Sequence, residues 1–293
     1  MNGSPPTSIA TAMSDATLDA RVLGIVSNSL DRLTPLELKR LAKHVCRTLE
    51  RGRIESSIKR LVQQRALIYT YQFGHSFLEP SFEKPVRVAN SIVLKPPECD
   101  YLSYHEALPG DIAISIKKGA AFGTGFHPTT RLSLQALEWV CRCFPLPESK
   151  NRTHLLDIGT GSGVLVIAGI RLGLDHGIGI DIDPCARVEA LENVTLNNLA
   201  AKIDISGDSL DAIAGNFSIV IANLRFPTLK DYFTRMVELL DTNGFLIVSG
   251  IKNNEIEPLK MVSTEHRMAV FWEGIEKEWA GLVFEPTSGF EKK

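Results

Sequence analysis

The sequence has few of the features that mark secreted, metal-binding or membrane proteins. Its 293 residues include five cysteines, and the closest pair is spaced Cys-x-Cys, which fits neither a zinc knuckle nor a redox Cys-x-x-Cys. No run of about 18 apolar residues occurs, so we expect no membrane-spanning helix. The N-terminus lacks the basic start and apolar stretch of a secretory signal. These absences predict reduced thiols, no membrane contact and a cytoplasmic protein.

The sequence also has little net charge. Its 32 basic and 34 acidic residues leave a formal charge of −2, which argues against binding a polyelectrolyte over the whole surface. The charge is uneven, however, because residues 36–65 contain nine Lys or Arg and three Glu, a local net of +6. A chain of this length predicts one large domain and a smaller one.

The N-terminal part is predicted to be helical. Residues 1–15 are rich in Ser, Thr, Pro and Ala and are expected to be a disordered tail. Residues 16–80 show three helical patterns and then two β-rich runs around Phe73-Gly74-His75. The second helix should begin with a capping box at Thr34 to Glu37, with Pro35 at its first position. Its predicted buried stripe is Leu38, Leu41, Ala42, Val45 and Leu49. The stripe predicted for the third helix is Ile54, Ile58, Leu61 and Val62.

Three helices followed by a hairpin are the outline of a winged-helix module. We interpret residues 16–80 as a helical, winged-helix-like domain for recognition or dimerisation. Its basic character has two explanations, a docking surface for an acidic partner or nucleic acid, and a solvated helix face in a packing module. The solvated helix face is favoured, because the sequence does not distinguish side chains that contact phosphates from side chains that only contact solvent. The oligomeric state is not predicted.

The rest of the chain has the pattern of an α/β domain. Residues 81–120 contain short β-like runs interrupted by prolines and are interpreted as a β-rich connector. Residues 121–293 then alternate helices and strands, which predicts a parallel sheet with helices on both faces. A ligand of such a domain binds beyond the carboxyl ends of the central strands.

A glycine-rich turn follows the first of these strands, at Asp157-Ile158-Gly159-Thr160-Gly161-Ser162-Gly163. Glycines let the backbone approach a ligand closely, and the helix start offers free N–H groups. A dinucleotide fingerprint would need a third glycine where Val164 stands. The form D-x-G-x-G-S-G instead resembles the S-adenosylmethionine turn of class I methyltransferases.

Acidic residues follow the next two strands. Asp181 lies 24 positions after Asp157, at the end of the adjacent strand, where it can accept hydrogen bonds from both ribose hydroxyls of a cofactor. Asp183 is the candidate N-cap of the helix that starts at Pro184. Asp208 has two open interpretations, a contact with the adenine amino group and another helix N-cap.

The fourth strand ends in "IVIANLRF", which places Asn223 where the reacting sulfur of the cofactor would lie. Methyl transfer is an in-line displacement, so an oriented amine with a free lone pair matters more than a strong base. We therefore predict that the Asn223 side chain holds the amine and that the Leu224 carbonyl is a second acceptor. A turn asparagine that satisfies its own backbone is the alternative.

Four segments together resemble one known family. "AFGTGFHPTTRLSLQAL", "LLDIGTGSGVLVIAGIRLG", "GIDIDPCA" and "IVIANL" are similar in order and spacing to the ribosomal protein L11 methyltransferase (PrmA) family, over roughly residues 85–285. They also resemble the mitochondrial electron-transfer-flavoprotein lysine methyltransferases. The resemblance implies a Rossmann-like class I fold with a seven-stranded, mostly parallel sheet. It implies S-adenosyl-L-methionine as cofactor and methylation of a lysine or α-amine on a ribosomal or other lysine-bearing protein.

The resemblance also implies particular cofactor contacts. By matched position these are Phe122, Gly123, Thr124, Thr130, Asp157, Gly159, Gly161, Asp181 and Asn223. The segment 121–130 is interpreted as a flap that leads into a helix and lies across the cofactor. Within it, His127 has no cluster of potential metal ligands in the sequence, so we expect no metal site and a hydrogen bond that orders the loop.

This sequence departs from the family in two places. Family members that modify the ribosomal protein carry a ferredoxin-like N-terminal domain, whereas residues 16–80 here indicate helices and a hairpin. Substrate choice in the family depends largely on that domain. In addition, Arg225 follows the Asn223-Leu224 pair and can either bring a cation to the acceptor site or turn outward.

Three other functions remain open. Methylation of a nucleic-acid base is less favoured, because such enzymes usually show Asn/Asp-Pro-Pro-Tyr/Phe where this chain has "NLRF". A small-molecule acceptor is compatible with the same catalytic motifs. A catalytically silent regulator that only binds the cofactor is disfavoured by the intact glycine turn, Asp181 and Asn223.

Overall fold

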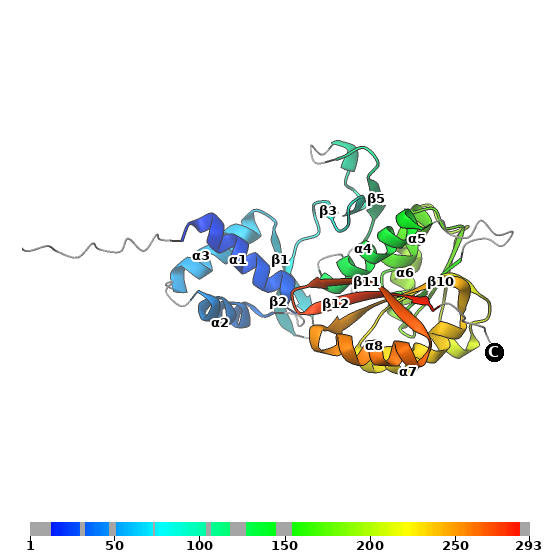
Figure 1. Ribbon diagram of the computed structural model, residues 1–293. Coiled ribbons are helices and arrows are strands. Elements are labelled where there is room, and N and C mark those ends of the chain that lie inside the picture. The colour runs from blue at the N-terminus through cyan, green and yellow to red at the C-terminus, as the bar shows by residue number, and fades with distance from the viewer. Residues whose placement is uncertain are drawn as a thin grey trace, which may run out of the picture. The chain divides into compact units, whose positions relative to one another are not determined.

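The computed structural model describes residues 13–29, 33–46, 51–72, 74–103, 107–117, 127–144 and 154–287. The chain divides into two compact units, Met1–Ser81 and Phe82–Lys293, which are described separately. Figure 1 shows the helices and strands of both units.

The N-terminal unit contains three helices and a hairpin. Its elements are α1 (Asp15–Asn28), α2 (Pro35–Val45), α3 (Arg51–Gln63), β1 (Leu67–Gln72) and β2 (His75–Pro80). The hairpin strands are antiparallel, and Leu33 forms an isolated antiparallel bridge with Leu78 on β2. This bridge adds a contact between the segment that joins α1 to α2 and the hairpin. The winged-helix interpretation stays a prediction.

Helix α2 begins as predicted but buries a narrower face. Thr34 and Glu37 form the capping box, and Pro35 is the first helical residue. Leu38 and Ala42 are fully buried. The predicted stripe is wrong at Leu41 and Val45, which are 42% and 53% exposed, while Leu49 lies outside the described residues. Residues three apart on a helix point in directions about 60° apart. The core of this unit covers the row of residues spaced four apart, which includes Leu38 and Ala42, and leaves Leu41 and Val45 outside it.

Ion pairs within the unit offset part of its basic charge. Lys39 pairs with Glu55 at 2.7 Å on the neighbouring helix. Arg53 and Arg60 pair with acidic residues of α1, and the Arg60–Asp19 pair has an N–O distance of 2.7 Å. The count over residues 36–65 leaves out these α1 carboxylates, so the local positive charge is smaller than that count indicates.

The C-terminal unit is built on a seven-stranded sheet with the order β11-β12-β10-β9-β6-β7-β8. Its strands are β6 (His154–Ile158), β7 (His176–Ile180), β8 (Ile203–Ser206), β9 (Phe217–Asn223), β10 (Leu240–Lys252), β11 (Met268–Glu276) and β12 (Trp279–Pro286). The pairs β6–β7, β6–β9, β7–β8 and β9–β10 are parallel, and β12 is antiparallel to both neighbours. The predicted seven-stranded, mostly parallel α/β sheet is confirmed.

Helices cover both faces of this sheet (Figure 1). Helices α4 (Pro128–Cys143), α5 (Val164–Arg171) and α6 (Pro184–Leu196) lie on one side, and α7 (Phe226–Glu238) and α8 (Ile256–Glu265) on the other. Each face has its own buried apolar cluster. Strands β3 (Val86–Arg87), β4 (Ile92–Lys95) and β5 (Ile112–Ser115) form a three-stranded sheet whose apolar residues join the α4–α5 cluster. No described helix is both long and apolar enough to cross a bilayer.

Candidate active site

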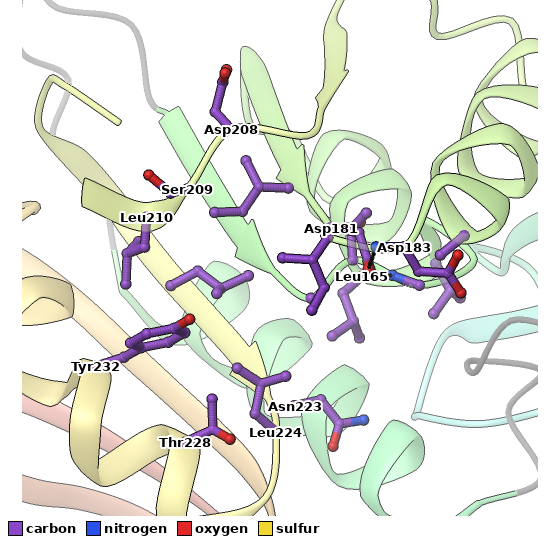
Figure 2. A pocket seen from close by; sticks show the side chains of 18 of the residues that line it. Leu165, Asp181, Asp183, Asp208, Ser209, Leu210, Asn223, Leu224, Thr228 and Tyr232 are labelled. Atoms are coloured by element: carbon purple, nitrogen blue, oxygen red, sulfur yellow. Dashed lines mark hydrogen bonds between the residues drawn. The ribbon is translucent and has the colours of Figure 1, made fainter. Parts of the chain in front are cut away.

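A pocket of about 450 Å³ opens at the carboxyl ends of the central strands. The strand ends meet there because Ile158 pairs in register with Ile180 on β7 and with Ala222 on β9. The next residue of each strand, Gly159, Asp181 and Asn223, therefore lies at one edge of the sheet, and all three line the pocket. Figure 2 shows Asp208 and Asn223 at opposite ends of this pocket in the view.

The glycine turn depends on backbone conformations that glycine adopts easily. Gly159, Gly161 and Gly163 have φ values of 70°, 55° and 79°. A Cβ on Gly159 would lie 2.7 Å from the side chain of Leu224, so the turn packs directly against that residue. The Gly161 N–H donates to Asp181 Oδ2 at 2.9 Å, which ties the turn to the end of β7.

The two carboxylates after β7 have different roles. Asp183 is the N-cap of α6 and accepts from the Cys185 N–H at 2.9 Å, so its predicted capping role is confirmed. Asp181 accepts one N–H on each oxygen, from Gly161 and from the backbone of Asp183, each at 2.9 Å. Each carboxylate oxygen can accept a second hydrogen bond, and Asp181 lines the pocket.

Asp157 lies behind the turn and is not among the described residues that line the pocket. It is fully buried, and its Oδ2 accepts from the Thr160 hydroxyl at 2.7 Å. Burial raises the pKa of Asp157 to about 7, and the nearby charge of Asp181 acts in the same direction, while the Thr160 hydrogen bond opposes it. The hydrogen bond from Thr160 shows that Asp157 holds the turn. The cofactor contact that the resemblance implies stays a prediction.

We expect the stability of the protein to depend on pH through Asp157. Its folded pKa, about 7, is above the ordinary value, so the stability it contributes is fully present below about pH 4 and is lost as pH rises towards 7. The free energy of unfolding of wild type should therefore fall relative to Asp157→Asn between pH 5 and pH 8, by at most about 3 kcal/mol. Urea unfolding of both proteins measures this, and a difference that does not change with pH would contradict it.

Asp208 stands at the outer end of the pocket and is exposed. Its Oδ2 accepts from the Ser206 hydroxyl at 2.8 Å. The alternative that Asp208 is an N-cap is wrong, because Ser209 holds that position of the short 3-10 turn η2 (Leu210–Ala212). The adenine contact stays a prediction.

Asn223 and Leu224 lie at the inner end of the pocket, and both line it. The Leu224 N–H donates to the carbonyl oxygen of Ser249 on β10 at 3.1 Å. Gly250 has a φ of 87°, and a Cβ there would collide with the Leu224 carbonyl. The position of the predicted second acceptor therefore depends on a glycine of the neighbouring strand. Arg225 is exposed at the N-cap position of α7 and is not among the described lining residues.

Thr130 brings the start of α4 to the pocket. The residue is 1% exposed, and its hydroxyl has no hydrogen-bond partner among the described residues. His127 caps this helix by accepting from the Thr129 N–H, which confirms the expected ordering hydrogen bond. Burial lowers the pKa of His127 to about 4, and nearby Arg131 adds to the effect, so the ring is neutral at pH 7 and can accept.

Three predicted cofactor contacts, Phe122, Gly123 and Thr124, lie outside the described residues. Among the pocket-lining residues that were not predicted from the sequence are Thr228 and Tyr232, two hydroxyl-bearing side chains. They are one turn apart on α7, and Figure 2 shows both side chains on the Leu224 side of the pocket. The feature of the sequence that could have indicated these two residues is their i, i+4 spacing on the helix that follows the Asn223 strand, which places both on one face.

The charge of the pocket restricts its ligand. Its described lining includes three carboxylates, Asp181, Asp183 and Asp208, and no Lys, Arg or His. Such a wall opposes the phosphates of a dinucleotide or a nucleoside triphosphate and favours a cationic ligand. Asp181 and the buried Thr130 hydroxyl can also bind the polar groups of that ligand.

The strand order, the single reversed strand and the pocket at the strand ends define a class I methyltransferase fold. The chain belongs to the ribosomal protein L11 methyltransferase (PrmA) family, whose model matches residues 80–287. The match leaves out nearly all of the N-terminal unit.

Curated relatives and a solved structure agree with this. A ribosomal protein L11 methyltransferase of Citrifermentans bemidjiense is 41% identical over 168 residues, which are 57% of this chain and 53% of that protein. One from Alkaliphilus oremlandii is 34% identical over 203 residues, 69% of this chain and 61% of that protein. The chain thus spans little more than half the length of these relatives. A crystal structure of a ribosomal protein L11 methylase from Lactobacillus delbrueckii subsp. bulgaricus has a TM-score of 0.59 and 24% identity, covers 69% of this chain and 97% of its own, and supports the fold.

Proposed function

We propose that the protein is an S-adenosyl-L-methionine-dependent methyltransferase that acts on an amino group of a protein. The observation that carries the proposal is that Gly159, Asp181 and Asn223 meet at one pocket, at the ends of three adjacent parallel strands. The turn and the carboxylate suit the cofactor, and the amide suits the acceptor.

The described residues fit this cofactor. Asp181 would accept from the ribose hydroxyls, and Asp208 would face the adenine amino group. Thr130 would bind the methionine end through its hydroxyl, which has no partner among the described residues. The net positive charge of the cofactor suits a wall with three carboxylates and no described basic side chain.

The bound cofactor would supply a methyl group on a positively charged sulfur. The Asn223 side-chain oxygen and the Leu224 carbonyl can each accept an N–H of the incoming amine, which points the nitrogen lone pair away from both and towards the methyl group. The described lining contains no His, Lys or Glu, and its three aspartates already accept hydrogen bonds from the Gly161 N–H, the Cys185 N–H and the Ser206 hydroxyl, so no side chain is assigned here as a general base. The amine should therefore lose its proton before it is held, and turnover should rise with pH until the acceptor is neutral.

The acceptor is proposed to be a ribosomal protein, since the relatives are ribosomal protein L11 methyltransferases. Such an acceptor would make the cytoplasm the place of action. The N-terminal unit, residues 1–81, lies almost entirely outside the family match. We infer that it recognises the acceptor or a second subunit, so that substrate choice in this chain can differ from that of the relatives.

Labelling with tritiated S-adenosylmethionine tests this function. The protein is incubated with host lysate, one sample is then treated with nuclease and another with protease, and retained label is measured. Label that survives nuclease and is lost with protease supports a protein acceptor. Label lost with nuclease would indicate base methylation, label in small solutes a small-molecule acceptor, and cofactor binding without label a silent regulator.

A further inference from the structure

Asn193 is a fully buried asparagine in α6 that is not among the described residues lining the active-site pocket and belongs to none of the motifs described above. Both ends of its side-chain amide bind backbone. Nδ2 donates to the carbonyl oxygen of Ser162 at 2.8 Å, and Oδ1 accepts from the Lys117 N–H at 2.8 Å. One side chain thus joins the glycine turn to the chain just beyond β5.

The bond to Ser162 complements the bond that Asp181 makes to the same turn. Asp181 accepts the N–H of Gly161, and Asn193 donates to the carbonyl of the following residue. Two successive residues of the turn are therefore held by side chains from two different elements. Gly161 lines the pocket, whereas Ser162 is fully buried.

The turn comes close enough to α6 for this contact because of Gly163. A Cβ on Gly163 would lie 3.3 Å from the Cα of Ala190, one helical turn before Asn193. Cβ atoms in proteins rarely come this close to another atom, so the lack of a side chain at Gly163 lets the turn pack tightly against the helix. Asn193 is then within reach of the carbonyl next to it.

We propose that Asn193 is a positioning residue for cofactor binding. It holds the glycine turn against α6 in the conformation that accepts the ligand, so that little ordering is left for the binding step. The inference rests on the proposed function, because it takes the glycine turn to be the cofactor site.

Asn197, the C-cap residue of the same helix, provides a matched control. It is 4% exposed and lies one turn after Asn193. Its amide also binds backbone at both ends, since Oδ1 accepts from the Ser115 N–H at 3.0 Å and Nδ2 donates to the Ser115 carbonyl at 2.7 Å. Asn193 and Asn197 thus share residue type, burial and the anchoring of the β5 segment. Asn193 alone of the two has a hydrogen bond to the glycine turn in the described structure.

The experiment compares Asn193→Ala with Asn197→Ala. Titration calorimetry with S-adenosylhomocysteine gives Kd for wild type and both variants, and thermal unfolding without ligand gives Tm. Both substitutions should lower Tm, because each leaves buried backbone groups unpaired. Asn193→Ala alone should raise Kd, by about ten-fold. Equal Kd values in wild type and Asn193→Ala, or equal increases in both variants, would overturn the proposal.

A second measurement separates this inference from the proposed function. Amide hydrogen exchange at Gly161, Ser162 and Gly163 without ligand should be faster in Asn193→Ala and unchanged in Asn197→Ala, and unchanged exchange in both variants contradicts the positioning role. Wild type that binds no S-adenosylhomocysteine would refute the proposed function instead, and exchange would still decide whether Asn193 holds the turn. If Asn193→Ala does not fold, Asn193→Ser, which keeps one short hydroxyl, should show a smaller rise in Kd of the same sign.

Discussion

Asp181→Ala is expected to raise the dissociation constant for S-adenosylmethionine about 100-fold in a protein that still folds. Asp181 follows β7 at the pocket edge, and its oxygens already accept the N–H groups of Gly161 and Asp183. The remaining lone pairs are available to the two ribose hydroxyls, and hydrogen bonds to a charged group are the stronger kind. Titration calorimetry measures the loss, and Asp211→Ala, an exposed aspartate outside the described lining, is the control with unchanged affinity.

The substitution also removes the hydrogen bond to the turn, so a second ligand is needed to identify the ribose contact. Wild type should prefer S-adenosylhomocysteine to its 2′-deoxy analogue by about ten-fold, the value of one charge-assisted hydrogen bond. Asp181→Ala should bind the two ligands almost equally. A variant that weakens binding but keeps the full preference would show that Asp181 acts only through the turn.

The parts of the site that the sequence predicted are those fixed by strand ends. Asp181 and Asn223 each follow a short apolar run, and parallel strands in register bring such residues to one edge whatever the rest of the chain does. The N-cap role of Asp183 could also be predicted, because a capping residue before a proline depends on local backbone geometry.

Other features depend on packing that the sequence does not express. Asn193 reads as an ordinary polar residue of a helix, and its partners at Ser162 and Lys117 lie 31 and 76 positions away. Gly250 matters because the backbone of Leu224 passes close to it. On α2, the apolar pattern alone did not show how wide a face the small N-terminal core would cover, so Leu41 and Val45 were wrongly placed inside.

Asn223→Ala should lower turnover about 100-fold while changing the affinity for S-adenosylmethionine far less. The side chain stands at the inner end of the pocket beside Leu224, and its proposed task is to orient the acceptor amine. Without it the amine keeps a single fixed acceptor, the Leu224 carbonyl, and can rotate out of line with the breaking bond. Tritium incorporation into the protein fraction at saturating cofactor measures turnover, and calorimetry measures affinity.

Two further variants make the result specific to position. Asn223→Gln keeps the amide but moves it by one methylene, and misplacement by about 1 Å can cost as much as removal, so its turnover should fall by a similar factor. Asn254→Ala removes an exposed asparagine of the same unit that is not among the described lining residues, and it should behave as wild type. Turnover equal to wild type in Asn223→Ala would rule out the positioning role. If cofactor affinity falls by the same factor as turnover, Asn223 would instead be assigned to cofactor binding. An interaction with the bound cofactor is lost already in the binding step, whereas an interaction with the acceptor is not.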